Sequence, residues 1–88
     1  MKAIKKSTLL DLARITRKYA RTGDVDILPA RIETAKKLAT QAYGMDNAWS
    51  SFAGFVDAVV GVYSFYPECT DEDFCKLFSA LKFEVLDE

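Results

Sequence analysis

The stretch from Ala48 to Tyr66 is the most apolar part of this chain, and it limits what the chain can fold into. Its one charged side chain is Asp57. The large apolar residues recur at steps of three and four, which is the spacing of one wide helical stripe. They are Trp49, Phe52, Phe55, Val56, Val59, Val60 and Tyr63. Because the run is too long for an ordinary strand, it predicts a central helix that the other segments cover.

Two other interpretations of this run have some support. Its second half favours a strand, because it holds the β-preferring residues Val59, Val60, Val62 and Tyr63. A break at Gly61 into a helix and a strand stays an alternative. A membrane span is disfavoured because Asp57 sits near the middle of the run and because Lys and Arg are not enriched beside it. We therefore expect the buried central helix of a small soluble domain.

Start and stop signals mark three shorter helices. Thr8 stands at an N-cap position with Asp11 three residues later, and Gly23 is a stop signal. Pro29 suits the first position of a second helix. Thr70 caps another, and the acidic residues that follow it lie at the positive end of the helix dipole.

The predicted fold class is all-α, a compact bundle of four helices at about residues 8–22, 29–43, 46–65 and 70–83. The 88 residues suffice for a single domain, residues 1–88, in which the basic lead 1–6 frays and residues 84–88 form an acidic tail. The side chains predicted to face inward from the three shorter helices are Leu9, Leu12, Ile15 or Thr16, Tyr19, Ile32, Ala35, Leu38, Ala39, Ala42, Tyr43, Phe74, Leu77, Phe78 and Leu81.

The residues that usually carry catalysis are scarce. Histidine is absent, which removes the commonest general base and the commonest metal ligand. Cys69 and Cys75, without further cysteines or an export signal, are expected to be free thiols in a reducing cytoplasm. Asp57 is the sharpest candidate for a perturbed acid, but neither thiol has a base beside it and no glycine-rich phosphate loop is present. We therefore expect no enzyme activity, no cofactor and no metal site.

Charge is divided unevenly along the chain, although the formal net charge is −1. Residues 1–40 carry ten basic and four acidic residues, a formal charge of +6, whereas residues 41–88 carry two and nine, a formal charge of −7. A basic pair of helices would bind nucleic acid through the phosphates. The contacts would be Arg14, Arg17, Lys18, Arg21, Arg31, Lys36 and Lys37. The interval between these helices is longer than the turn of a helix-turn-helix motif, which disfavours DNA recognition of that type. Nucleic-acid binding is therefore kept as the alternative function.

Aromatic residues are concentrated in the acidic half, with nine of the eleven after Gly44. We expect some of them at the surface, where a partner protein or a second copy of the chain would cover them. The predicted partner-binding residues are Phe65, Tyr66, Glu68, Asp71, Glu72 and Asp73. The predicted function is a small cytoplasmic protein-binding module, an adaptor, inhibitor or regulator that occupies a surface on a heterologous partner. A viral or mobile-element accessory protein fits that description, and self-association is a further expectation.

Overall fold

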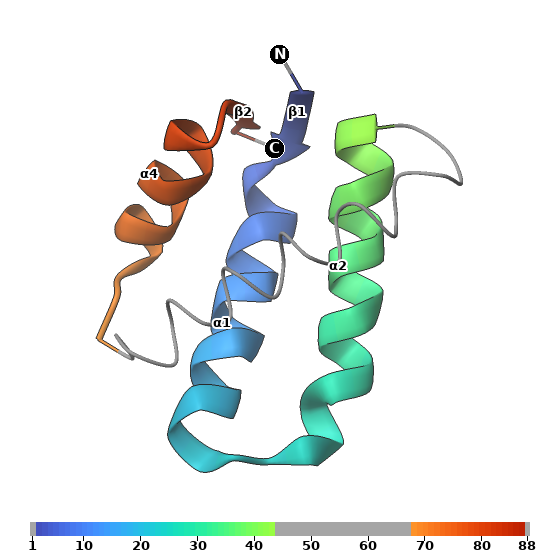
Figure 1. Ribbon diagram of the computed structural model, residues 1–88, viewed down its shortest axis with the longest axis vertical. Helices are drawn as coiled ribbons and strands as arrows, with labels where there is room; N and C mark the ends of the chain where they lie inside the picture. Colours follow the sequence, from blue (N-terminus) through green and yellow to red (C-terminus); the bar gives the residue numbers. More distant parts are fainter. Residues whose placement is uncertain (1, 44–67, 88) are drawn as a thin grey trace.

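The computed structural model describes residues 2–43 and 68–87. In chain order they form β1 (Lys2–Lys5), α1 (Lys6–Thr22), the short helix η1 (Val25–Ile27), α2 (Leu28–Tyr43), α4 (Asp71–Ala80) and β2 (Phe83–Leu86). Helices α1 and α2 lie side by side as an antiparallel hairpin, and α4 packs against the other side of α1 (Figure 1). The predicted helix 46–65 lies outside the described residues, as do Asp57, Phe65 and Tyr66.

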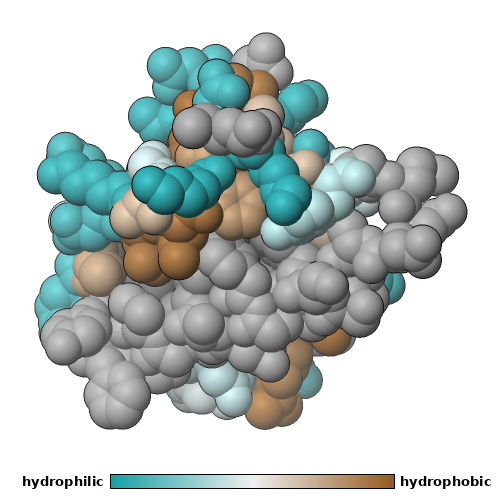
Figure 2. Space-filling model, turned by 45° about the horizontal axis from the view of Figure 1, so that its top comes forward, coloured by the Kyte–Doolittle hydropathy of each residue, from teal (hydrophilic) through white to brown (hydrophobic). Residues whose placement is uncertain are grey.

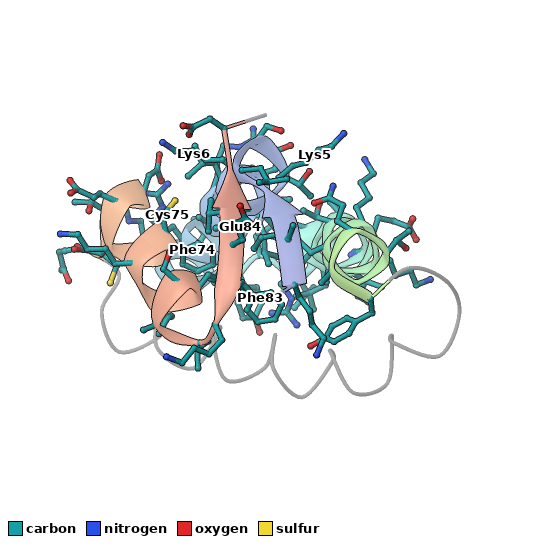
Figure 3. All side chains as sticks on the ribbon, turned by 90° about the horizontal axis from the view of Figure 1, so that it is seen from above. Lys5, Lys6, Phe74, Cys75, Phe83 and Glu84 are labelled. Carbon is teal, nitrogen blue, oxygen red and sulfur yellow. The ribbon has the colours of Figure 1, made fainter. Side chains whose placement is uncertain are left out.

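The two ends of the described chain pair with each other. Strands β1 and β2 form a parallel sheet in which Ile4 lies opposite Val85. Seen from above, β2 lies between α4 and β1, and β1 lies between β2 and α2 (Figure 3). Ile4 is completely buried and Phe83 nearly so, which places one face of the sheet on the core.

This sheet overturns the predicted fold class. The all-α bundle of four helices is wrong, because the described residues form three α-helices and a parallel pair of strands. The lead that was expected to fray is β1, and most of the expected acidic tail belongs to β2. A strand of four residues has too little periodicity to identify alone, and the hydrogen bonds that stabilise it come from the opposite end of the chain.

The start of α1 is set by the strand before it. The helix begins at Lys6, and the predicted N-cap Thr8 lies inside its first turn. Instead of capping, the Thr8 hydroxyl accepts a hydrogen bond from the Gln41 side chain. The predicted stop is confirmed, since Gly23 adopts a left-handed conformation with φ 67° and donates its N–H to the carbonyl of Tyr19.

The other helices begin close to the predicted positions. Helix α2 begins at Leu28, one residue before Pro29, because η1 leads directly into it. The Thr70 cap of α4 is confirmed, and its partner in the capping box is Asp73. Helix α4 ends at Ala80, earlier than predicted, because Lys82 takes a positive φ of 72° and β2 begins at Phe83.

The core lies where α1, α2, α4 and the sheet meet. Its buried apolar side chains are Ile4, Leu9, Leu12, Ala13, Ala35, Leu38, Ala39, Phe74, Phe78 and Phe83. The Phe78 ring lies 5.0 Å from that of Phe74 and 5.9 Å from that of Phe83, so α4 and β2 share one aromatic cluster. Each fully buried side chain of this size contributes about 1.5–3 kcal/mol. Three residues predicted to face inward, Ile32, Tyr43 and Leu81, are exposed.

Two further properties concern the surface. Among residues 2–43 and 68–87, no helix is both long and apolar enough to cross a membrane. In the view of Figure 2, apolar areas, coloured brown, lie next to hydrophilic side chains, coloured teal. The exposed large apolar side chains of the described residues are Val25, Ile32, Tyr43 and Leu81.

Candidate functional site

The acidic residues predicted to bind a partner mostly take part in contacts within the fold. Asp71 forms an ion pair with Arg17, whose guanidinium also donates to the carbonyl of Cys69 at 3.4 Å. Glu72 pairs with Lys76 at 3.4 Å on the surface of α4. Glu68 is exposed, directly after the residues that the structure leaves undescribed. The Arg17 contacts join the start of α4 to α1, whereas the Glu72–Lys76 pair lies within α4 and leaves both side chains exposed.

Asp73 acts as a cap for α4. Its side chain accepts the backbone N–H of Thr70 at 3.1 Å, and the Thr70 hydroxyl accepts the N–H of Asp73 at 3.1 Å. The backbone hydrogen bond from Thr70, followed by the side-chain one, lowers the pKa of the Asp73 carboxyl below its ordinary value. This carboxylate is therefore used at the helix start.

The two thiols are free and half-buried in the structure. Burial raises the pKa of the Cys75 thiol, and Lys6 opposes that effect only in part. A raised pKa leaves less thiolate at neutral pH, so Cys75 is a weak nucleophile. In the described ranges, no group of three or more Cys, Asp or Glu side chains is placed to hold a metal ion.

Several of the basic residues that were predicted to bind nucleic acid contact other side chains of the fold. Arg31 lies over the Tyr19 ring, 5.6 Å from its centroid. Arg14 pairs with Asp11 at 3.5 Å, next to it on the surface of α1. Together with the inward-turned Arg17, these contacts reduce the basic surface that is left for a ligand.

Part of the basic surface remains. Lys18 and Lys37 are exposed, and neither forms an ion pair within the part of the chain that the structure describes. Arg14, Lys18 and Arg21 follow one another at steps of four and three, which places them on one side of α1.

Exposed large apolar side chains are concentrated on α2 and the short helix before it. Four such residues are exposed in the described part, namely Val25 (61%), Ile32 (44%), Leu81 (44%) and Tyr43 (38%). Val25, Pro29, Ile32, Lys36 and Tyr43 recur at helical spacing, so they fall on one side of α2 continued back into η1. We call these five residues the α2 stripe.

The middle of the α2 stripe, at Ile32, points away from α1. Tyr43, at the end of the stripe, packs edge-on against the buried Phe83 ring at 6.4 Å between centroids, and the Lys2 ammonium lies 4.3 Å from the Tyr43 centroid. On the opposite side of α2, Gln41 donates to Thr8 of α1 and Arg31 covers the ring of Tyr19. The buried positions Thr34, Ala35, Leu38 and Ala39 face the core. The side of α2 that carries Ile32 is therefore the side that the hairpin does not use.

An open groove lies beside the α2 stripe. It has a volume of about 320 Å³ and is lined by Glu33, Lys36, Lys37, Thr40 and Gln41. Glu33 and Lys36 approach to 3.7 Å across one turn of the helix, and both side chains remain more than half exposed. The apolar residues of the stripe thus have charges of both signs at their edge.

A second hollow, of about 310 Å³, lies at the start of α1 and is lined by Lys6, Ser7, Leu10 and Asp87. Its two charged residues approach each other to 3.8 Å, since Lys6 pairs with Asp87. This pair balances the charge there and joins the end of β2 to α1. The hollow is therefore accounted for by the packing of the chain ends.

Of the α2 stripe, the sequence predicted only Lys36 as a binding residue, for nucleic acid. Ile32 and Tyr43 were predicted to face the core, and Val25 lies between the predicted helices 8–22 and 29–43. Helical geometry could have indicated that Ile32 is exposed, because Ile32 lies well away from the buried Leu38 around the helix axis. Comparisons with protein-family models, curated proteins and solved structures found no match, so the function is inferred from the residues of this chain.

Proposed function

We propose that this chain is a small non-enzymatic protein-binding module, an adaptor, inhibitor or regulator that acts by occupying a surface on another protein. One observation carries the proposal: three of the four large apolar side chains exposed in the described residues lie on the α2 stripe. The α2 stripe thus becomes the favoured contact surface, in place of the partner-binding residues around Glu68 and Asp71 that the sequence predicted.

The composition of the stripe suits a protein interface. Covering apolar surface contributes about 25 cal/mol per Å². Val25 and Ile32 supply such surface, and Glu33 and Lys36 supply a charged rim beside it. An apolar centre with a polar rim is the usual composition of an interface between proteins. A helix that presents one apolar side is recognised by a groove or by another helix.

The stripe is also held in place by the rest of the fold. α2 contributes Leu38 and Ala39 to the core, and its Gln41 is hydrogen-bonded to α1. A rigid binding surface loses less conformational entropy when a partner binds, which favours affinity. The proposal involves no catalytic step; burial raises the pKa of the Cys75 thiol, which leaves less thiolate at neutral pH.

Capture of partner proteins from cells that produce this chain tests the proposal. Ile32→Glu places a charge in the middle of the α2 stripe, and we expect the variant to lose the proteins that the wild type captures. Leu81→Glu is the matched control, because Leu81 has the same exposed fraction as Ile32, 44%, but lies after α4. Equal loss with both variants, or no loss with Ile32→Glu, would contradict binding through the stripe. Circular dichroism of each variant checks that the fold is kept.

Nucleic-acid binding is a second candidate, supported by the alignment of Arg14, Lys18 and Arg21 on α1 and by exposed Lys37 on α2. Binding through phosphates weakens steeply as salt rises, because counterions are released. Lys18→Glu should then weaken a gel shift with nonspecific DNA at low salt, while Ile32→Glu should leave it unchanged. No shift by the wild type at low salt would rule this candidate out.

A further inference from the structure

We propose that the α2 stripe also binds a second copy of this chain, with the two α2 helices packed antiparallel about a twofold axis. The inference rests on the proposed function, because it names an occupant of the same stripe. A twofold interface uses one patch twice, so the patch must be complementary to itself. Both the apolar and the charged residues of the stripe meet that condition.

The apolar residues match when the twofold axis passes the level of Thr34. At that register Val25 of one copy lies at the level of Tyr43 of the other, and Ile32 lies at the level of Lys36. In the outer turns, Val25 therefore meets the exposed part of the Tyr43 ring, whose other contacts are Phe83 and Lys2 of its own chain. Ile32 packs against the methylene stem of the lysine, whose charged end reaches the solvent.

The charged residues match at the same register. Glu33 of one copy lies one residue, a rise of about 1.5 Å, from the level of Lys36 of the other. The twofold axis repeats the contact, so two pairs of opposite charge form between the copies. Glu33 already reaches Lys36 within its own chain at 3.7 Å, which shows that the two side chains are long enough to meet. Both remain more than half exposed and can reach a second chain.

The length of α2 sets the size of the interface. Its sixteen residues span about 24 Å, and one side of such a helix from each copy buries less than the roughly 1,200–2,000 Å² of a standard stable complex. The dimer is therefore weak and reversible. It protects the apolar stripe at high concentration and dissociates when a tighter-binding partner takes its place.

Exchange of the two charges tests the pairing. Sedimentation equilibrium of the full chain, from micromolar to millimolar concentration, should show a monomer–dimer equilibrium. Glu33→Lys alone, or Lys36→Glu alone, puts like charges together twice and should weaken the dimer about tenfold. An equimolar mixture of the two variants should recover wild-type dimerisation, because each contact then joins Lys with Glu. Lys18→Glu mixed with Glu33→Lys is the matched control. Lys18 lies on α1, outside the interface, so the Lys18→Glu chains dimerise with each other, the mixed dimer keeps one like-charge contact, and the mixture should stay below wild-type dimerisation.

Recovery on mixing separates an interface effect from a folding effect. Loss of the Glu33–Lys36 pair within one chain affects each variant alone, and mixing cannot repair it. A wild type that stays monomeric up to millimolar concentration overturns the inference. So does a dimer that neither Ile32→Glu nor the charge exchange weakens. If Ile32→Glu still loses captured proteins in either case, the proposed function stands without the dimer, and if it captures them normally, both fail.

Discussion

The side-chain oxygen of Gln41, on α2, accepts a hydrogen bond from the backbone N–H of Lys5 at 2.8 Å. The amide nitrogen of the same side chain donates to the Thr8 hydroxyl at 2.9 Å. One residue thus joins α2 to the point where β1 becomes α1. The Lys5 N–H lies on the edge of β1 that faces α2 and not β2 (Figure 3). Gln41 therefore gives the Lys5 N–H at the edge of β1 a hydrogen-bond acceptor. Its two hydrogen bonds also help to orient α2, with Ile32 facing outward.

Replacing Gln41 by Ala removes both hydrogen bonds. We expect the free energy of unfolding to fall by about 1 kcal/mol, the usual net contribution of such contacts. In a domain of this size that lowers Tm by about 4–8 °C. Thr40→Ala is the control, because within residues 2–43 and 68–87 the Thr40 hydroxyl donates to the Lys36 carbonyl of its own helix. Urea titrations that show equal effects for the two variants would contradict the role of Gln41.

Ile4→Ala tests whether the chain start is a structural strand. Ile4 is completely buried beside Val85, so its truncation leaves a cavity and should lower the free energy of unfolding by about 2–5 kcal/mol. Lys5→Ala, on the exposed side of the same strand, should change it by less than about 0.5 kcal/mol. A frayed lead would make both substitutions harmless, and chemical denaturation distinguishes the two cases.

Thr16→Val should stabilise the protein. Thr16 is completely buried on α1, and its hydroxyl has no hydrogen-bond partner in the described structure. Valine keeps the shape and removes a buried polar group, so we expect a gain of about 1 kcal/mol in the free energy of unfolding. Thr34→Val is the matched comparison, because the buried Thr34 hydroxyl donates to the Ala30 carbonyl at 2.8 Å. Calorimetry should show a higher Tm for the first variant and no gain for the second.

Stability should depend on the charge of Asp73 at acidic pH. Its pKa is lowered in the folded state from the ordinary value of 3.8 by the hydrogen bonds with Thr70. A lowered folded pKa means that the contribution is complete above the unfolded pKa and is lost as pH falls through the folded one. Asp73→Asn keeps a hydrogen-bond acceptor but carries no charge. The free energy of unfolding of this variant should therefore fall less than that of the wild type as pH is lowered below about 5, the range in which carboxylates titrate. Identical acid profiles in urea titrations would show that this carboxylate does not contribute.

Local sequence signals were sufficient where neighbouring residues decide the structure. Gly23 ends α1, and Thr70 with Asp73 begins α4, because these contacts join residues a few positions apart. The same type of signal failed at Thr8. There the helix starts earlier because β1 leads straight into it, and β1 exists only because β2 lies beside it.

The candidate site could be predicted only in part. Helical spacing identified Leu38 and Ala39 as core residues, and both are buried. It also predicted that Ile32 faces inward, because the sequence does not distinguish an apolar residue beside the buried side of a helix from one that lies on it. The direction from which α1 approaches α2 decides that Ile32 is exposed, and that direction depends on contacts such as Gln41 with Thr8.

From its residue pattern alone, this chain determines where its helices α1, α2 and α4 form, because caps, stops and apolar spacing act over a few residues. The tertiary structure alone decides that Lys2–Lys5 pairs with Phe83–Leu86, that Arg17 meets Asp71, and that Val25 and Ile32 are exposed. The physical reason is range. These contacts join positions far apart in the chain, and they form only when the packing of the whole domain brings them together.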